Sequence, residues 1–160
     1  MRTPKLIFMI GIPGSGKTSW LRKQLLSDKV IEHILIVSPD KIRKELYEDI
    51  SCQDNNAEVW AIAKNRTKEY LSKGISVILD ATNVNSTYRS LFLEGLPPCI
   101  LQAKIFRANP EDCWERIQND LKKGVDRSNV PKEVIDRMYT DFTQTTQIID
   151  LEGFKLIDDL

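Results

Sequence analysis

An eight-residue segment near the N-terminus has the composition of a phosphate-binding loop. It runs Gly11-Ile12-Pro13-Gly14-Ser15-Gly16-Lys17-Thr18 and matches the pattern G-x-x-x-x-G-K-[ST] at every fixed position. Glycines let the backbone N–H groups of such a loop turn onto an anion, and the following helix adds the positive end of its dipole. We expect Lys17 to reach the β- and γ-phosphates of a nucleotide and the Thr18 hydroxyl to bind Mg²⁺. A glycine-rich turn with nothing bound is the alternative, and the complete pattern disfavours it.

Asp80 is the second residue that could bind a metal ion. It ends an apolar run at residues 75–80, as the second acidic residue of phosphate-loop enzymes does. There the carboxylate holds Mg²⁺ directly or through water. A carboxylate that caps a turn or a helix is the alternative interpretation.

Asp40 and Arg43 follow another apolar run, at residues 34–37. A carboxylate at this place can accept the proton of an acceptor hydroxyl that faces a γ-phosphate. The arginine three residues later can bind an anionic group of the acceptor with two parallel hydrogen bonds. The residues alone equally allow a helix cap at Asp40 with an i,i+3 ion pair on the surface.

Polar residues after the third apolar run could orient an acceptor. Thr82 and Asn83 come directly after it, and Arg89 follows within the next helical segment. Each can donate a hydrogen bond to a substrate, and we expect these residues to bind the acceptor. Roles in turns and caps are equally ordinary for such residues.

A charged segment separates the last two long helical patterns. Four basic and two acidic residues lie between positions 116 and 127, namely Arg116, Lys122, Lys123, Arg127, Asp120 and Asp126. A mobile basic segment of this kind can close over a nucleotide, exclude water and bring an arginine onto the transferring phosphoryl group. We therefore expect a lid at about residues 116–130, with a solvated loop as the alternative.

Apolar runs of strand length alternate with helical segments along the chain. Strands are expected at residues 6–10, 34–37, 75–80, 100–106 and 154–157, and helices at 18–26, 41–49, 57–73, 87–93, 110–122 and from 131 onward. Asp40 and Asn109 are expected to cap helices, and residues 51–56 to form a loop. This alternation predicts an α/β fold with a parallel sheet covered by helices on both faces. Because ligands bind at the carboxyl ends of such strands, the three polar loops should share one crevice.

Length and composition predict one globular domain, residues 1–160. Hydrophobic residues make up 41% of the 160, and 23 basic residues balance 23 acidic ones, which argues against a broad nucleic-acid-coating surface. The three cysteines, Cys52, Cys99 and Cys113, are expected to be reduced thiols, and the single His33 cannot build a metal site. The first apolar run is too short for a signal peptide or a membrane span, so a cytoplasmic protein is expected.

These residues together resemble the 5′-hydroxyl polynucleotide kinases, a family of phosphate-loop kinases. The motifs that carry the resemblance are the phosphate loop, Ser38-x-Asp40-x-x-Arg43, Asp80-x-Thr82-Asn83 with Arg89, and Arg127 shortly before Val130-Pro131. The resemblance extends from residue 5 to about residue 142 and leaves no room for the phosphatase domain of some members. It implies a phosphate-loop kinase fold with a helical lid, ATP as donor and Mg²⁺ as cofactor.

The resemblance also implies a function and residue roles. ATP would phosphorylate the 5′-hydroxyl of a DNA or RNA end, with Asp40 as general base and Arg43 on the acceptor phosphate. Lys17 and a lid arginine would be catalytic, and the lid spacing allows either Arg127 or Arg116 on the donor phosphates. A kinase of a nucleoside, sugar or antibiotic and a nucleotide-dependent ATPase or switch are the alternatives. The sequence leaves open the choice of DNA or RNA and the oligomeric state.

Overall fold

The computed structural model describes residues 2–27, 33–47 and 56–160, and within them five strands form one parallel sheet. The strand order is β2-β3-β1-β4-β5. The strands are β1 (Lys5–Ile10), β2 (Ile34–Val37), β3 (Ser76–Leu79), β4 (Ile100–Ile105) and β5 (Lys155–Leu156). All four pairings are parallel, as the alternation of strands and helices predicts.

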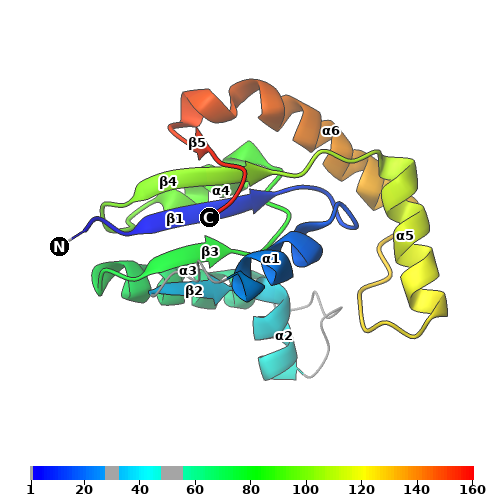
Figure 1. Ribbon diagram of the computed structural model, residues 1–160, viewed down its shortest axis with the longest axis horizontal. Helices are drawn as coiled ribbons and strands as arrows, with labels where there is room; N and C mark the ends of the chain where they lie inside the picture. The colour runs from blue at the N-terminus through cyan, green and yellow to red at the C-terminus, as the bar shows by residue number, and fades with distance from the viewer. Residues whose placement is uncertain (1, 28–32, 48–55) are drawn as a thin grey trace.

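Helices cover both faces of this sheet (Figure 1). They are α1 (Lys17–Leu26), α2 (Pro39–Tyr47), α3 (Asn56–Ser72), α4 (Ser86–Leu93), α5 (Pro110–Lys122) and α6 (Lys132–Ile148), and a 3₁₀ turn, η1 (Ile149–Glu152), follows α6. Alternate residues of β1 point to opposite faces. Phe8 belongs to the core that contains residues of α3 to α6, whereas Met9 belongs to the core formed with α1. The expected α/β fold of phosphate-loop kinases is therefore confirmed.

The beginning of α2 differs from the prediction. The helix begins at Pro39, so Asp40 lies inside its first turn and does not cap it. The side chain of Ser38 takes that place, because its hydroxyl accepts a 3.4 Å hydrogen bond from the N–H of Lys41. Proline favours the first helical position because it has no N–H to satisfy, which explains the earlier start. The predicted end of this helix and most of the loop predicted at 51–56 lie outside the described residues, although Asn56 itself begins α3.

The other helix ends follow local sequence signals. Asn109 caps α5 by accepting hydrogen bonds from the N–H groups of Glu111 and Asp112, with Pro110 at the first helical position. Gly74, which has a φ of 76°, follows the end of α3. The predicted strand at 154–157 is reduced to two paired residues.

Helix α5 lies beyond the carboxyl edge of the sheet, and α6 runs from the loop that follows α5 back over the sheet toward β5 (Figure 1). Two ion pairs fix this part of the chain. Lys132 at the start of α6 contacts Glu111 at 2.8 Å, and Asp126 in the loop contacts Lys44 of α2 at 3.2 Å. Within the described ranges, no helix combines the length and the apolar character that a membrane crossing requires.

Candidate active site

The phosphate loop connects the end of β1 to the first turn of α1. Gly16 precedes α1 in a left-handed conformation, with a φ of 98°, and no side chain caps this helix end. The N–H groups of the first turn of a helix have no partner within the helix and carry partial positive charge. The structure therefore presents at this loop the helix terminus that phosphate-loop proteins use to bind anions.

At two positions of the loop, neighbouring atoms leave no space for a side chain, so glycine is needed there. A Cβ atom at Gly14 would lie 2.7 Å from the carbonyl oxygen of Cys113, in the first turns of α5. A Cβ atom at Gly11 would lie 2.6 Å from the Ser15 hydroxyl and 2.8 Å from Cβ of Phe106. Because real Cβ atoms do not approach other atoms so closely, the loop can fold around an anion only with glycine at these positions.

Lys17 lies over its own loop. Its ammonium group donates hydrogen bonds of 2.8 Å to the carbonyl oxygens of Gly11 and Ile12. Burial lowers the pKa of Lys17 to about 8, against the favourable effect of the nearby Asp80 carboxylate. Burial deprives the ammonium group of hydration, and the surrounding protein groups replace that stabilisation only in part. A phosphate placed here would therefore stabilise the charged form.

Asp80, at the end of β3, lies in the same crevice as Lys17 and Asp40. Burial raises its pKa, Lys17 acts in the opposite direction, and the negative charge of Asp40 raises it further. Charges interact more strongly the closer they lie, so these mutual effects indicate that the three groups are near one another. The structure thus brings together at one sheet edge the phosphate-loop lysine, the candidate metal ligand and the candidate general base.

The residues in this crevice fit Mg²⁺ bound together with a nucleotide. No group of three or more His, Cys, Asp or Glu side chains that could hold a metal occurs in the described parts of the chain. Mg²⁺ is usually bound by one or two protein oxygens, with phosphate and water oxygens completing its octahedron. Asp80 and the exposed Thr18 can supply those protein oxygens.

Arg43 is buried, whereas its partner Asp40 is open to solvent. Arg43 has 7% of its surface exposed, and its Nη1 donates to Oδ1 of Asp40 at 2.5 Å. Its Nη2 donates to the side-chain oxygen of Asn56 at 2.5 Å, which fixes the guanidinium between α2 and α3. The i,i+3 ion pair of the alternative interpretation is thus present, although its arginine is buried, and the Asp40 side chain stays 65% exposed.

Of the two candidate lid arginines, Arg116 contacts the phosphate loop directly, and Arg127 acts on its lysine through its charge. Nη1 of Arg116 donates a 2.7 Å hydrogen bond to the carbonyl oxygen of Gly14. Arg127 forms a 2.6 Å ion pair with Asp120, and its charge contributes to the lowered pKa of Lys17. Among buried side-chain atoms of the described residues, only Nε of Arg43 and Nε of Arg127 have no hydrogen-bond partner. Each of these arginines thus keeps one buried donor without a partner, a kind of group that a bound ligand or water can satisfy.

The loop after β3 is engaged in internal hydrogen bonds. The carbonyl oxygen of Thr82 accepts a 3.0 Å bond from the N–H of Gly11, and the side-chain amide of Asn83 donates to the carbonyl of Met9 at 2.8 Å. Asn83 also adopts a φ of 52°, which asparagine tolerates better than most residues. In this geometry Asn83 holds the loop against β1. Its amide N–H₂ group is used in these internal hydrogen bonds and is not directed to a phosphoryl-acceptor substrate.

Arg89, which was expected to bind the acceptor, lies among internal polar groups in this structure. Arg89 is only 1% exposed, and its guanidinium is bound by Glu152 and by oxygens of Asn83 and Thr145. Glu152 and Thr145 could not be predicted as partners, because no local pattern connects them with a residue about 60 positions earlier. The same holds for Asn56 as a partner of Arg43.

Solved structures confirm the fold and include proteins of nucleic-acid repair. The Pnkp1/Rnl/Hen1 RNA repair complex contains a chain with a TM-score of 0.75 and 19% identity, covering 92% of this chain and 46% of that one. Another Pnkp1/Rnl/Hen1 complex matches with a TM-score of 0.57 and 24% identity, covering 72% and 40%. A candidate kinase of Chloroflexus aurantiacus matches with a TM-score of 0.67 and 19% identity, covering 84% and 76%. The chain thus spans less than half the length of the two repair proteins.

A comparison with curated proteins finds no significant match. The family comparison is decisive, because the AAA_33 family, described as an AAA domain, matches residues 6–145 and so includes every motif of the site. With the phosphate loop and the parallel sheet, this match supports an ATP-dependent phosphotransferase of the phosphate-loop kinase class. The chain belongs to the AAA_33 family, as a kinase-like domain whose structural neighbours include chains of Pnkp1/Rnl/Hen1 complexes.

Proposed function

We propose that this protein transfers the γ-phosphate of ATP to the 5′-hydroxyl of a DNA or RNA end. The observation that carries the proposal is the position of Asp40. Its carboxylate is exposed, lies within electrostatic reach of Lys17 and Asp80, and is held by a buried arginine. A general base must lie beside both the transferring phosphoryl group and the acceptor hydroxyl, and this crevice provides such a place.

In the proposed reaction the acceptor oxygen attacks the γ-phosphorus while Asp40 takes the hydroxyl proton. The bond between the γ-phosphorus and the β,γ-bridging oxygen breaks, and ADP leaves with the electron pair. Lys17 and the loop N–H groups hold the β- and γ-phosphates, and a lid arginine, Arg127 or Arg116, neutralises charge on the transferring group. Bound Mg²⁺, held by Thr18 and Asp80, would supply further charge neutralisation on the phosphates.

Arg43 supports an acceptor that itself carries a phosphate. Its buried guanidinium points two donors to Asp40 and Asn56 and leaves Nε without a partner. A polynucleotide 5′ end offers an anion next to its hydroxyl, namely the first internucleotide phosphate. Similarity to a chain of an RNA repair complex agrees with this choice of acceptor. Thr82 is the remaining candidate for a direct acceptor contact from the loop after β3.

The test is label transfer from γ-labelled ATP with Mg²⁺ to a 5′-hydroxyl oligonucleotide, beside the same oligonucleotide already 5′-phosphorylated. DNA and RNA versions are run in parallel. We expect label on the hydroxyl form alone. No label on either form, with ATP binding intact, would overturn the polynucleotide acceptor, and a panel of nucleosides, sugars and antibiotics would then be assayed. Turnover that ignores every added acceptor would indicate an ATPase.

The base assignment is tested separately with Asp40→Asn. This change keeps the shape of the side chain and removes its basicity, so turnover should fall by about 10²–10⁴-fold while ATP affinity stays near its original value. Glu45→Gln is the matched control on the same helix, because Glu45 pairs with Arg66 at 2.7 Å instead of facing the crevice. Near-normal turnover of Asp40→Asn would refute the assignment.

A further inference from the structure

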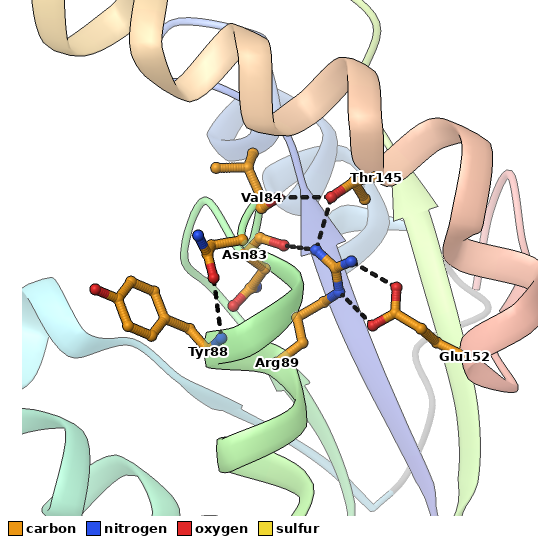
Figure 2. A network of polar contacts seen from close by, with 7 residues as sticks. Asn83, Val84, Tyr88, Arg89, Thr145 and Glu152 are labelled. Carbon is orange, nitrogen blue, oxygen red and sulfur yellow. Dashed lines mark hydrogen bonds and ion pairs between the residues drawn. The ribbon is translucent and has the colours of Figure 1, made fainter.

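Arg89 lies at the centre of a polar network between α4, α6 and η1 (Figure 2). Its Nε and Nη2 donate to the two carboxylate oxygens of Glu152 at 3.2 and 2.6 Å. Its Nη1 donates to the hydroxyl of Thr145 at 2.9 Å and to the carbonyl oxygen of Asn83 at 2.8 Å. Thr145 in turn donates to the carbonyl oxygen of Val84 at 2.6 Å. Two consecutive carbonyl groups of the loop after β3 are therefore held by this network.

The same loop contacts the active site on its other side. Thr82 accepts the N–H of Gly11, the first residue of the phosphate loop, and Asn83 donates to the carbonyl of Met9. Asp80, the candidate Mg²⁺ ligand, begins this loop. Residues 80–84 therefore lie between the phosphate loop and the Arg89 network, and each side contributes hydrogen bonds of 3.0 Å or shorter.

The network also includes α6, the helix that follows the predicted lid segment, and the 3₁₀ turn η1 after it. Thr145 lies near the end of α6, Glu152 ends the 3₁₀ turn that follows, and α6 begins directly after the predicted lid segment. Arg89 connects Glu152 to the loop, because its guanidinium contacts Glu152, Thr145 and Asn83 together. Thr145 also contacts the loop directly, at the carbonyl of Val84. Figure 2 shows the neighbouring Tyr88 pointing away from the network, so the contacts belong to Arg89 specifically.

We propose that Glu152 and Thr145 are positioning residues that hold the loop of residues 80–84 and its Asp80 against the phosphate loop. Glu152 acts through Arg89, and Thr145 acts both through Arg89 and through its own hydrogen bond to the carbonyl of Val84. Together they set the geometry in which Asp80 and Thr18 bind Mg²⁺. This inference rests on the proposed kinase site, although not on the identity of the acceptor. A network that only stabilises the fold would affect the melting temperature and leave the metal dependence unchanged.

The test compares four variants. Glu152→Gln removes the charge that orients Arg89 while keeping a similar shape, and Thr145→Val removes the hydroxyl that links Arg89 to the carbonyl of Val84. Thr145→Ser keeps that hydroxyl and should behave like the original protein. Glu45→Gln is the control for loss of an Arg–Glu pair elsewhere, because it breaks the pair of hydrogen bonds that Arg66 donates to the two carboxylate oxygens of Glu45.

Two quantities are measured for each variant. One is the Mg²⁺ concentration that gives half-maximal ATP turnover, which we expect to rise about 10–100-fold in Glu152→Gln and Thr145→Val, as for other residues that orient metal ligands. The other is the hydrogen-exchange rate of the Gly11 amide in protein without nucleotide or metal, which should increase in the same two variants. That amide reports the loop directly, because it donates to Thr82.

Unchanged values of both quantities in Thr145→Val and Glu152→Gln would overturn the proposal, even if their melting temperatures fall. If Glu152→Gln does not fold, the Val and Ser variants at position 145 decide the question, since they differ in the hydroxyl. An equal effect of Thr145→Val and Thr145→Ser would also contradict the proposal. The exchange measurement needs no acceptor, so a failure of oligonucleotide phosphorylation would remove the proposed acceptor and leave this result standing.

Discussion

Replacement of Gly14 by alanine should abolish tight nucleotide binding while the protein still folds. Two costs arise at this position. The φ of 80° lies in the left-handed region, where an alanine costs roughly 1–2 kcal/mol relative to glycine. The new Cβ would also lie 2.7 Å from the carbonyl oxygen and 3.2 Å from the Cα of Cys113, both in the backbone of α5. Helix backbone cannot rotate away as a side chain can, so the phosphate loop itself must move.

Gly74→Ala separates these two costs. Gly74 has a φ of 76°, close to that of Gly14, no atom lies within 4 Å of its hypothetical Cβ, and it lies outside the predicted lid. This variant should carry only the cost of the left-handed backbone, so its melting temperature should fall by about 2–8 °C for a chain of this size. In Gly14→Ala the free energy of unfolding should fall by roughly a further 1–3 kcal/mol because of overpacking, which lowers the melting temperature by about 2–12 °C more.

Nucleotide affinity gives the sharper measurement. If displacement of the loop removes one charge-assisted hydrogen bond to a phosphate, worth about 1.5–3 kcal/mol, the affinity for Mg²⁺-ATP falls about 10–150-fold. Titration calorimetry on folded protein at a temperature well below both melting transitions would measure it. Gly74→Ala should bind as the original protein does. If Gly14→Ala binds normally and has the melting temperature of Gly74→Ala, the close approach of the loop to α5 does not constrain the site.

Three further predictions concern stability and charge. Asn109→Ala removes the cap of α5 and should cost about 1 kcal/mol, seen calorimetrically as a melting temperature about 2–4 °C lower. Phe142→Ala, at a side chain only 5% exposed, should cost about 3–5 kcal/mol in denaturant titration, and a cost below 1 kcal/mol would contradict its place in the core. A folded-state pKa of about 8 for Lys17, below the ordinary 10.5, means that the unfolded chain binds more protons between these pH values. The unfolding free energy should therefore rise over that window by up to about 3 kcal/mol more than in Lys17→Met, and parallel curves would refute the lowered pKa.

The parts of this protein that could be predicted from sequence are those encoded by neighbouring residues. The phosphate loop is an eight-residue pattern, and the buried parallel strands are continuous apolar runs, as at residues 75–80. The cap at Asn109 follows from the residue itself and the proline after it. The start of α2 was predicted wrongly because Ser38 and Asp40 are both good cap residues, and only the backbone decides between them.

Burial of charged residues could not be predicted in this way. Arg89 and Arg43 both lie on short helices after a strand, and nothing in the adjacent sequence distinguishes them. Arg89 is buried because Glu152, 63 positions later, comes to lie beside it. Arg43 is buried because α3 places Asn56 against it. Such partners are determined by how the helices pack, which single-residue patterns do not contain.

The degree of charge compensation distinguishes residues of the crevice from structural ones. The guanidinium of Arg89 is paired at Nε, Nη1 and Nη2, and a carboxylate neutralises its charge. Arg43 and Arg127 each keep a buried Nε without a partner, although each has an acidic neighbour. Lys17 has a lowered pKa and Asp80 a raised one, so burial disfavours the charged form of both in the protein alone. A triphosphate with Mg²⁺ would compensate these deficits at once, because its oxygens accept from lysine and arginine while its metal ion neutralises the aspartate. Binding should consequently stabilise the fold, and by more than the contacts of any one residue would suggest, since several uncompensated groups gain partners in the same event.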